Sequence, residues 1–158
     1  MKLCLLLLPA VLFAGSADPF VGAWHLNPSK SRYAPGQCPK SMTIEMASAG
    51  NGISYRSETE FADGRRSKTS YTAAYDGPEA LVMGSAGMQT PVVLKRLGYR
   101  MVEADYVRNM HVVASSRRVL SANDRVMTIT TTSKDKNGKE ITSFGVYEKD
   151  VATAAAQR

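Results

Sequence analysis

Side chains that commonly bind metals are few in this sequence and lie far apart. The chain of 158 residues has two histidines, His25 and His111, and two cysteines, Cys4 and Cys38. Metal sites need several ligands at short spacing, as in H-x-H or H-E-x-x-H, and no such pattern occurs here. We therefore expect no metal site and no cofactor.

Residues for acid-base or nucleophilic catalysis are equally scarce. No serine lies in a G-x-S-x-G motif, and neither histidine has the neighbours of a catalytic triad. Glu58 and Glu60 are two positions apart, so they share one face of a strand, and their charges suit solvation better than catalysis. We expect no catalytic residues and interpret the protein as a non-enzyme.

The amino-terminal residues 1–17 predict export. Lys2 precedes an apolar run over residues 3–13, and small residues suited to a signal peptidase follow at 15–17. The apolar run is shorter than the ~20 residues that span a bilayer. We predict a cleavable signal peptide, no transmembrane segment in the mature chain, and a periplasmic or extracellular location.

Cleavage would remove Cys4 and leave Cys38 as the single mature cysteine, which excludes an internal disulfide. Two interpretations of Cys38 remain open: a disulfide to a second copy, which would give a dimer, or an incidental, partly covered thiol.

The formal net charge is +6, but the basic residues are interspersed with acidic ones. A mixed, solvated surface fits this pattern, and we expect no nucleic-acid partner.

Turn signals divide the rest of the chain into short segments that alternate between polar and apolar residues. The signals are Asn51-Gly52, Asp63-Gly64, Asp76-Gly77, Asn123-Asp124 and Asn137-Gly138. Such dipeptides accept the positive φ that hairpin turns require. The alternation places one set inward: Phe20, Gly22, Trp24 and Leu26; Met42, Ile44 and Met46; Ile53, Tyr55, Ser57, Thr59 and Phe61; Met127, Ile129 and Thr131.

These segments predict strands at 20–26, 41–47, 53–61, 66–75, 80–84, 91–97, 99–107, 111–120, 125–132 and 139–149. Consecutive hairpins in this number form a sandwich or close into a barrel, and closure removes exposed edges. We therefore expect an all-β fold, an antiparallel up-and-down β-barrel of eight to ten strands at 18–150. Asn27-Pro28 predicts a short helical turn, and the Ala-rich tail at 151–158 is expected to be flexible.

Several motifs together resemble a family of small exported bacterial lipocalin-like proteins whose function is largely unassigned. The motifs are Gly22-x-Trp24, Asn27-x-x-Lys30-Ser31-x-Tyr33-x-Pro35-Gly36, Pro39-Lys40-Ser41, Tyr75-Asp76-Gly77, Leu94-Lys95-Arg96, Arg118-Val119-Leu120-Ser121 and Val146-Tyr147-Glu148-Lys149. The first resembles the opening of the calycin group, which includes lipocalins and fatty-acid-binding proteins. The resemblance implies that Trp24 plugs one end of the barrel and that a late basic residue, Arg118, Lys149 or Arg96, packs on its ring.

One departure from the group concerns ligand binding. Fatty-acid-binding proteins close with Arg-x-Tyr, which holds a ligand carboxylate, whereas Gly145 precedes Tyr147 at this spacing. The usual carboxylate clamp is therefore absent from this position.

We expect the barrel to bind a small, largely apolar ligand in its interior, because the inward residues are apolar with scattered polar groups. The candidate ligand-binding residues are Trp24, Tyr55, Tyr71, Arg96, Tyr106 and Arg118. A barrel filled by side chains, with the hydroxyls bonded to each other or to buried water, remains an equal alternative. In another interpretation the barrel is only the scaffold of a protein-interaction or envelope-maintenance module, and the loop at 33–39 contacts a partner.

Overall fold

The structure is a computed structural model that describes residues 17–34, 36–85 and 87–150. Residues 1–16 of the expected signal peptide and the expected tail at 151–158 lie outside the described residues. In the part of the chain that is described, no helix is long and apolar enough to cross a membrane.

In the described ranges, eleven antiparallel strands form a single sheet, and one short helical turn follows the first strand. The strands are β1 (Gly22–Leu26), β2 (Ser41–Ser48), β3 (Gly52–Glu60), β4 (Arg66–Ala74), β5 (Met83–Gly84), β6 (Gly87–Met88), β7 (Val92–Gly98), β8 (Met101–Arg108), β9 (His111–Leu120), β10 (Val126–Lys134) and β11 (Glu140–Lys149). The turn is the 3₁₀ helix η1 (Pro28–Lys30), in which the side chain of Asn27 accepts a hydrogen bond from the Lys30 N–H at 3.3 Å. The predicted cap and Pro position are confirmed.

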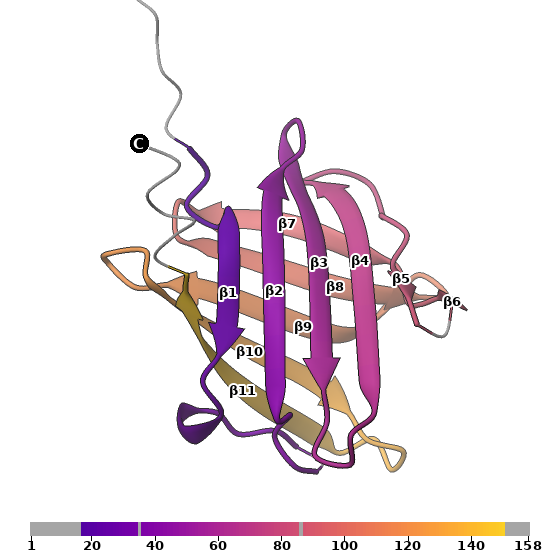
Figure 1. Ribbon diagram of the computed structural model, residues 1–158. Helices are drawn as coiled ribbons and strands as arrows, with labels where there is room; N and C mark the ends of the chain where they lie inside the picture. Colours follow the sequence, from indigo (N-terminus) through magenta and orange to yellow (C-terminus); the bar gives the residue numbers. More distant parts are fainter. Residues whose placement is uncertain (1–16, 35, 86, 151–158) are drawn as a thin grey trace, which may run out of the picture.

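The sheet curls so that its first and last long strands meet. Neighbouring strands follow chain order except that β1 pairs with β11. Figure 1 shows β1–β4 side by side in front, with β7–β11 crossing behind them, so the core lies between the two halves of one curled sheet. The predicted all-β up-and-down architecture is confirmed.

Closure is incomplete between β4 and β7. Among the described residues, backbone pairing between the two sides is limited there to the isolated bridges Tyr75↔Leu94 and Ala80↔Val92. Pro78 and Pro91 flank residues 79–90, which lie between β4 and β7. Proline has no N–H with which to extend a ladder of hydrogen bonds. The strand predicted at 80–84 is accordingly reduced to the two-residue strand β5, followed by the two-residue β6.

The predicted inward faces are confirmed along most strands. Phe20, Trp24 and Ile44 are at most 1% exposed, and Met127 is completely buried. The turn predicted at Asn51-Gly52 lies one residue earlier, because Gly50 takes the positive φ of 56° and Gly52 already belongs to β3. Alternation fixes which face is buried, whereas the choice between two adjacent turn residues depends on strand register.

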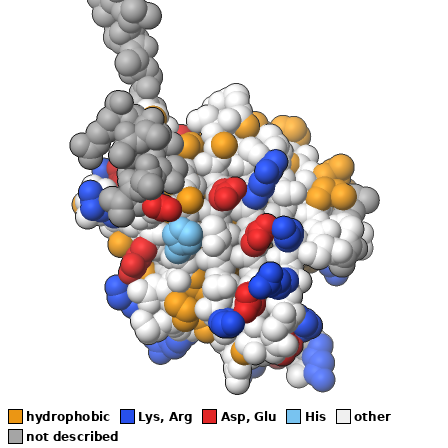
Figure 2. All heavy atoms as spheres, viewed as in Figure 1, with side chains coloured by type: hydrophobic (Ala, Val, Ile, Leu, Met, Phe, Trp, Pro, Cys, Tyr) orange, Lys and Arg blue, Asp and Glu red, His pale blue; other side chains and the backbone are white. Residues whose placement is uncertain are grey.

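The outer face of β1–β4 carries acidic and basic side chains close together (Figure 2). Lys68 pairs with Glu58 at 2.6 Å, and Glu60 pairs with Lys40 at 2.7 Å and Arg66 at 3.1 Å. The two glutamates therefore lie in a solvated charge ladder, as the sequence predicts.

Candidate functional site

Trp24 closes one end of the barrel. Its ring is completely buried, and its Nε1–H donates to the Phe20 carbonyl at 2.9 Å. The Lys149 Nζ lies 5.0 Å from the centroid of the ring and donates to the Pro19 carbonyl at 3.0 Å. A Cβ added at Gly22 would lie 2.7 Å from Lys149 Cε. The glycine therefore makes room for the lysine stem, and Lys149 is the basic residue that packs on the tryptophan.

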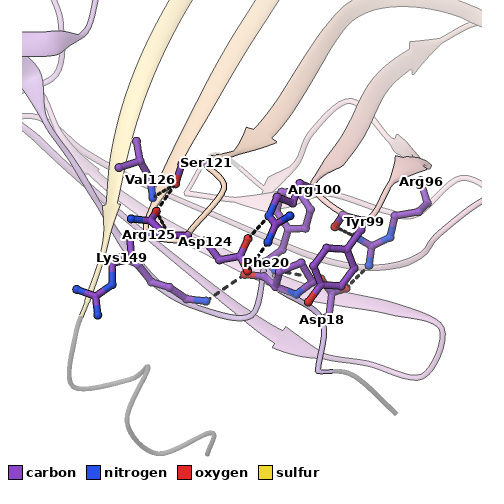
Figure 3. Close-up of polar contacts among 12 residues, drawn as sticks. Asp18, Phe20, Arg96, Tyr99, Arg100, Ser121, Asp124, Arg125, Val126 and Lys149 are labelled. Atoms are coloured by element: carbon purple, nitrogen blue, oxygen red, sulfur yellow. Dashed lines mark hydrogen bonds and ion pairs between the residues drawn. The ribbon is translucent and has the colours of Figure 1, made fainter.

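Polar contacts cover this Trp24 end (Figure 3). The Arg96 guanidinium donates to Asp18 at 2.6 Å, and the Tyr75 hydroxyl donates to the same carboxylate at 2.7 Å. Nearby, Arg100 donates to Asp124 at 2.6 Å. Arg96 also stacks over the ring of Tyr75, with 4.0 Å from its guanidinium carbon to the ring centroid. Arg96 and Arg100 each have a carboxylate partner, so this network seals the barrel end.

A cavity of about 150 Å³ lies in the interior on the other side of the core from this seal. We call it the inner cavity. On β2 and β11, the residues paired with Trp24 are Ile44 and Lys149. The inner cavity begins two residues further from the seal on each strand, at Met42 and Tyr147. Its lining residues are Tyr33, Met42, Tyr55, Tyr106, Ser116, Arg118, Ile129, Thr131, Ser143, Gly145 and Tyr147. The wall therefore combines aromatic and apolar surface with one cationic side chain, which is the character of a ligand pocket.

Arg118 is the central feature of the inner cavity. It is only 2% exposed, because β9 turns Ser116, Arg118 and Leu120 inward while its neighbour Arg117 faces solvent and pairs with Glu103 at 2.8 Å. The Arg118 Nη2 donates to the Tyr71 hydroxyl at 2.6 Å. Its Nε and Nη1 have no hydrogen-bond partner among the described residues. No carboxylate among the described residues forms an ion pair with it, so the cavity contains an uncompensated positive charge.

Two stacked tyrosines support the guanidinium. The rings of Tyr55 and Tyr71 lie 4.7 Å apart with an interplanar angle of 9°. The Arg118 guanidinium carbon is 5.0 Å from the Tyr55 centroid and 6.0 Å from that of Tyr71. Cation–π attraction offsets part of the desolvation of the arginine. The rings therefore hold the guanidinium in place, and its Nε and Nη1 stay buried without a hydrogen-bond partner among the described residues.

A second polar pair lies across the inner cavity from this group. The hydroxyls of Tyr33 and Tyr147 share a hydrogen bond of 2.8 Å, and Tyr147 donates to Met42 Sδ at 3.2 Å. A Cβ at Gly145 would lie 2.8 Å from the Tyr33 hydroxyl. The glycine that replaces the arginine of the Arg-x-Tyr pattern therefore makes space for Tyr33. In this chain the interior cation comes from β9 instead.

Burial keeps the cavity tyrosines protonated. Desolvation raises the pKa of Tyr55 to about 12, although the Arg118 charge acts in the opposite direction. Burial likewise raises the pKa of Tyr71 and of Tyr147. At neutral pH these hydroxyls are therefore neutral hydrogen-bonding groups, and among the described lining residues Arg118 alone is charged.

Alkali should unfold the barrel through these tyrosines. The pKa of Tyr55 is about 12 in the folded state and ~10 in an unfolded chain. Above pH ~10 the unfolded chain loses a proton that the folded state keeps, so stability falls as pH rises and levels off above the folded pKa. Between pH 9 and 12, we expect the free energy of unfolding to fall by about 2 to 3 kcal/mol less in Tyr55→Phe than in the parent, because phenylalanine has no proton to lose. Urea unfolding at each pH measures this; equal losses would show that Tyr55 titrates normally.

The structure brings only some of the predicted site residues together. Tyr55, Tyr106 and Arg118 line the inner cavity. Tyr71, whose ring stacks on that of Tyr55, accepts a hydrogen bond from Arg118. Trp24 and Arg96 lie at the sealed end and do not line it.

Sequence reasoning did not name the other lining residues as ligand contacts. Met42, Ile129 and Thr131 were already on predicted inward faces, so the alternation could have identified them. Tyr33 carries no such signal, because it belongs to a loop whose path depends on tertiary packing.

The loop considered as a partner-binding surface is divided between surface and interior: Ala34, Gly36 and Gln37 are exposed, whereas other residues face the core. Tyr33 reaches the inner cavity, Pro39 is buried, and Cys38 packs half-buried against the core. Burial raises the pKa of the Cys38 thiol, which lowers its thiolate fraction. Nothing in the structure supports a dimer through this residue. Within the described ranges, no three His, Cys, Asp or Glu side chains gather as metal ligands.

Comparison with known proteins places the fold. No protein-family model matches the sequence, and no curated protein matches it. The chain is similar to the crystal structure of zebrafish ileal bile acid-binding protein complexed with cholic acid, with a TM-score of 0.56 and 12% sequence identity over 84% of this chain and 99% of that chain. The fold is calycin-like. It has the architecture of the fatty-acid-binding proteins, as the G-x-W opening suggested, and the similarity at this identity concerns the fold.

Proposed function

We propose that this chain is a non-enzymatic binding protein whose barrel takes a small amphipathic ligand, with an acidic group of the ligand bound to Arg118. The observation that carries the proposal is the buried guanidinium with two unpartnered nitrogens. A buried charge without a partner costs several kcal/mol. A carboxylate that accepted a charge-assisted hydrogen bond from Nη1 or Nε would give this buried charge the partner it lacks.

The rest of the wall suits the apolar part of such a ligand. Met42 and Ile129 provide aliphatic surface, and the ring of Tyr55 provides aromatic surface. The Tyr33 and Tyr147 hydroxyls are hydrogen-bonded to each other, so they do not require a polar group of the ligand as a partner. The similar zebrafish protein was crystallised with cholic acid, an acid, which is consistent with this ligand chemistry.

Calorimetric titration with hexanoate and 1-hexanol tests the proposal. We expect hexanoate to bind more tightly than the alcohol, and Arg118→Met to weaken hexanoate about 10- to 100-fold, because hydrogen bonds to charged groups contribute about 1.5–3 kcal/mol. Arg117→Met is the matched control: it removes an adjacent arginine from the outer face and should leave the affinity unchanged.

Equal affinity of the parent and Arg118→Met for hexanoate would contradict the proposal. So would an absence of binding by any short carboxylate to the parent protein while it remains folded by circular dichroism. Equal weakening in both variants would indicate a general charge effect rather than a site at Arg118.

The proposal includes export. Residues 1–17 have the pattern of a signal peptide, and Asp18, directly after the expected cleavage point, is held in the folded body by Arg96 and Tyr75. A periplasmic or extracellular bacterial protein of the lipocalin-like type fits these features. Amino-terminal sequencing of protein recovered outside the cytosol should begin at Asp18, and recovery of the uncleaved chain in the cytosol would contradict export.

A further inference from the structure

A large hollow lies beside the β8–β9 hairpin, near the edge of the sheet that β6 forms (Figure 1). We call it the hairpin hollow, and it measures about 900 Å³. One wall is the segment before β7, which contributes Gln89 and Pro91, and the other is the hairpin, which contributes Val107, Met110 and Val113. The hairpin hollow is therefore a recess with apolar side chains on two walls from separate parts of the chain.

The tip of the β8–β9 hairpin presents an apolar side chain to solvent at the rim of this hollow. Asn109 and Met110 form the turn, and both have positive φ, 50° and 63°. Such turns favour asparagine and glycine, so methionine is an unfavoured choice for the backbone. Met110 is nevertheless 93% exposed, and Val113 is 41% exposed. Exposed apolar side chains grouped at a strained turn indicate a contact surface, because folding alone gains nothing from them.

Two opposite charges line the hairpin hollow without pairing with each other. Glu79 belongs to the segment between β4 and β5, and Arg108 belongs to the hairpin. Both side chains are exposed, and neither forms an ion pair with a described residue. The Arg108 Nη2 donates to the neutral Thr90 Oγ1 at 3.1 Å, which holds the guanidinium at the wall. The hollow therefore carries one acid and one base, each without a partner of opposite charge in this chain.

A surface with a projection, a recess and two opposite charges can complement a second copy of itself. In a two-fold contact the same patch meets itself, so a pair of residues that touch across the contact does so twice. Met110 lies on the rim of the recess, so the tip of each copy can enter the recess of the other. Glu79 of each copy can then face Arg108 of the other.

We propose that the hairpin hollow is the contact surface of a two-fold dimer, in which the Met110 tip of each copy occupies the hollow of the other. Glu79 pairs with Arg108 between the copies. The occupant is a second copy of this chain because the two unpaired charges become complementary under two-fold symmetry. Cys38 does not line the hollow and takes no part in the contact. The dimer is independent of the proposed function.

Sedimentation equilibrium in reducing buffer tests the inference at protein concentrations up to about 1 mM, a range that detects weak contacts between small patches. We expect a reversible monomer–dimer equilibrium. Met110→Gly should weaken self-association about tenfold or more, since the apolar tip is lost, and it should fold, because glycine accepts the positive φ of this turn. Leu97→Ala is the matched control: Leu97 is 48% exposed but does not line the hollow, so the dimer should be unchanged.

Reversal of the two charges tests the two-fold arrangement. Glu79→Arg and Arg108→Glu should each weaken the dimer about tenfold or more, because like charges then face each other across the contact. The double variant, which carries both reversals, should recover most of the parent's self-association, since opposite charges meet again.

Four results would overturn the inference. One is a protein that stays monomeric over the whole concentration range, which would leave the hollow to a small molecule or to a different protein. Another is a dimer that forms only without reducing agent, because Cys38 would then make the contact. Equal weakening in Met110→Gly and Leu97→Ala would show that the hollow is not the contact surface. A double charge reversal that recovers nothing would show that Glu79 and Arg108 do not meet.

Discussion

Replacing Trp24 with alanine should lower the free energy of unfolding by about 3 to 5 kcal/mol, the range for truncating a buried large aromatic side chain. The ring is completely buried and its Nε1–H bonds to the Phe20 carbonyl, so the variant loses apolar burial and leaves a buried carbonyl without its partner. Domains of this kind typically have ~5 to 15 kcal/mol in total. Urea unfolding at neutral pH measures the loss.

Phe144→Ala is the matched control for this truncation. Phe144 is also aromatic and lies in a strand, but it is 38% exposed, so we expect a loss of about 1 kcal/mol or less. Trp24→Phe should fall between the two, since it keeps a ring but loses the hydrogen bond. Similar midpoints for Trp24→Ala and Phe144→Ala would contradict the role of Trp24 as the plug of the barrel.

The sequence was most informative where a local pattern decides the outcome. Alternation in 41–47 and 53–61 predicted the buried faces of β2 and β3, because a strand turns successive side chains to opposite sides. The Asn27-Pro28 cap was equally local. The short strand in the segment at 80–84 was harder to predict, because its pairing depends on which backbone groups β4 and β7 leave unpaired.

The site depends on long-range choices that a single sequence does not display. Arg118, Lys149 and Arg96 were equal candidates for packing on Trp24. The structure assigns Lys149 to that ring, pairs Arg96 with Asp18, and leaves Arg118 alone in the interior. The choice follows from register: Lys149 lies opposite Trp24, and Gly22 leaves space for its stem. Such spatial complementarity connects residues more than a hundred positions apart.

Replacing Arg118 with methionine should stabilise the unliganded protein. The arginine is a buried cation with two unpartnered nitrogens, and replacing buried charges by apolar residues of similar volume often gains about 1–4 kcal/mol. The Tyr71 hydroxyl loses one hydrogen bond, which costs about 1 kcal/mol. We therefore expect a net gain of about 1 to 3 kcal/mol in urea unfolding. Arg117→Met, on the exposed face, should change stability by about 1 kcal/mol or less.

This gain should reverse when an acid is present. A ligand that binds only the folded state stabilises it according to its concentration relative to Kd. Hexanoate should therefore raise the unfolding midpoint of the parent and of Arg117→Met, and leave Arg118→Met unchanged. If Arg118→Met is instead less stable than Arg117→Met without ligand, the contacts of the guanidinium with Tyr55 and Tyr71 outweigh its desolvation. The arginine would then be a structural residue rather than the binding site of an acidic ligand.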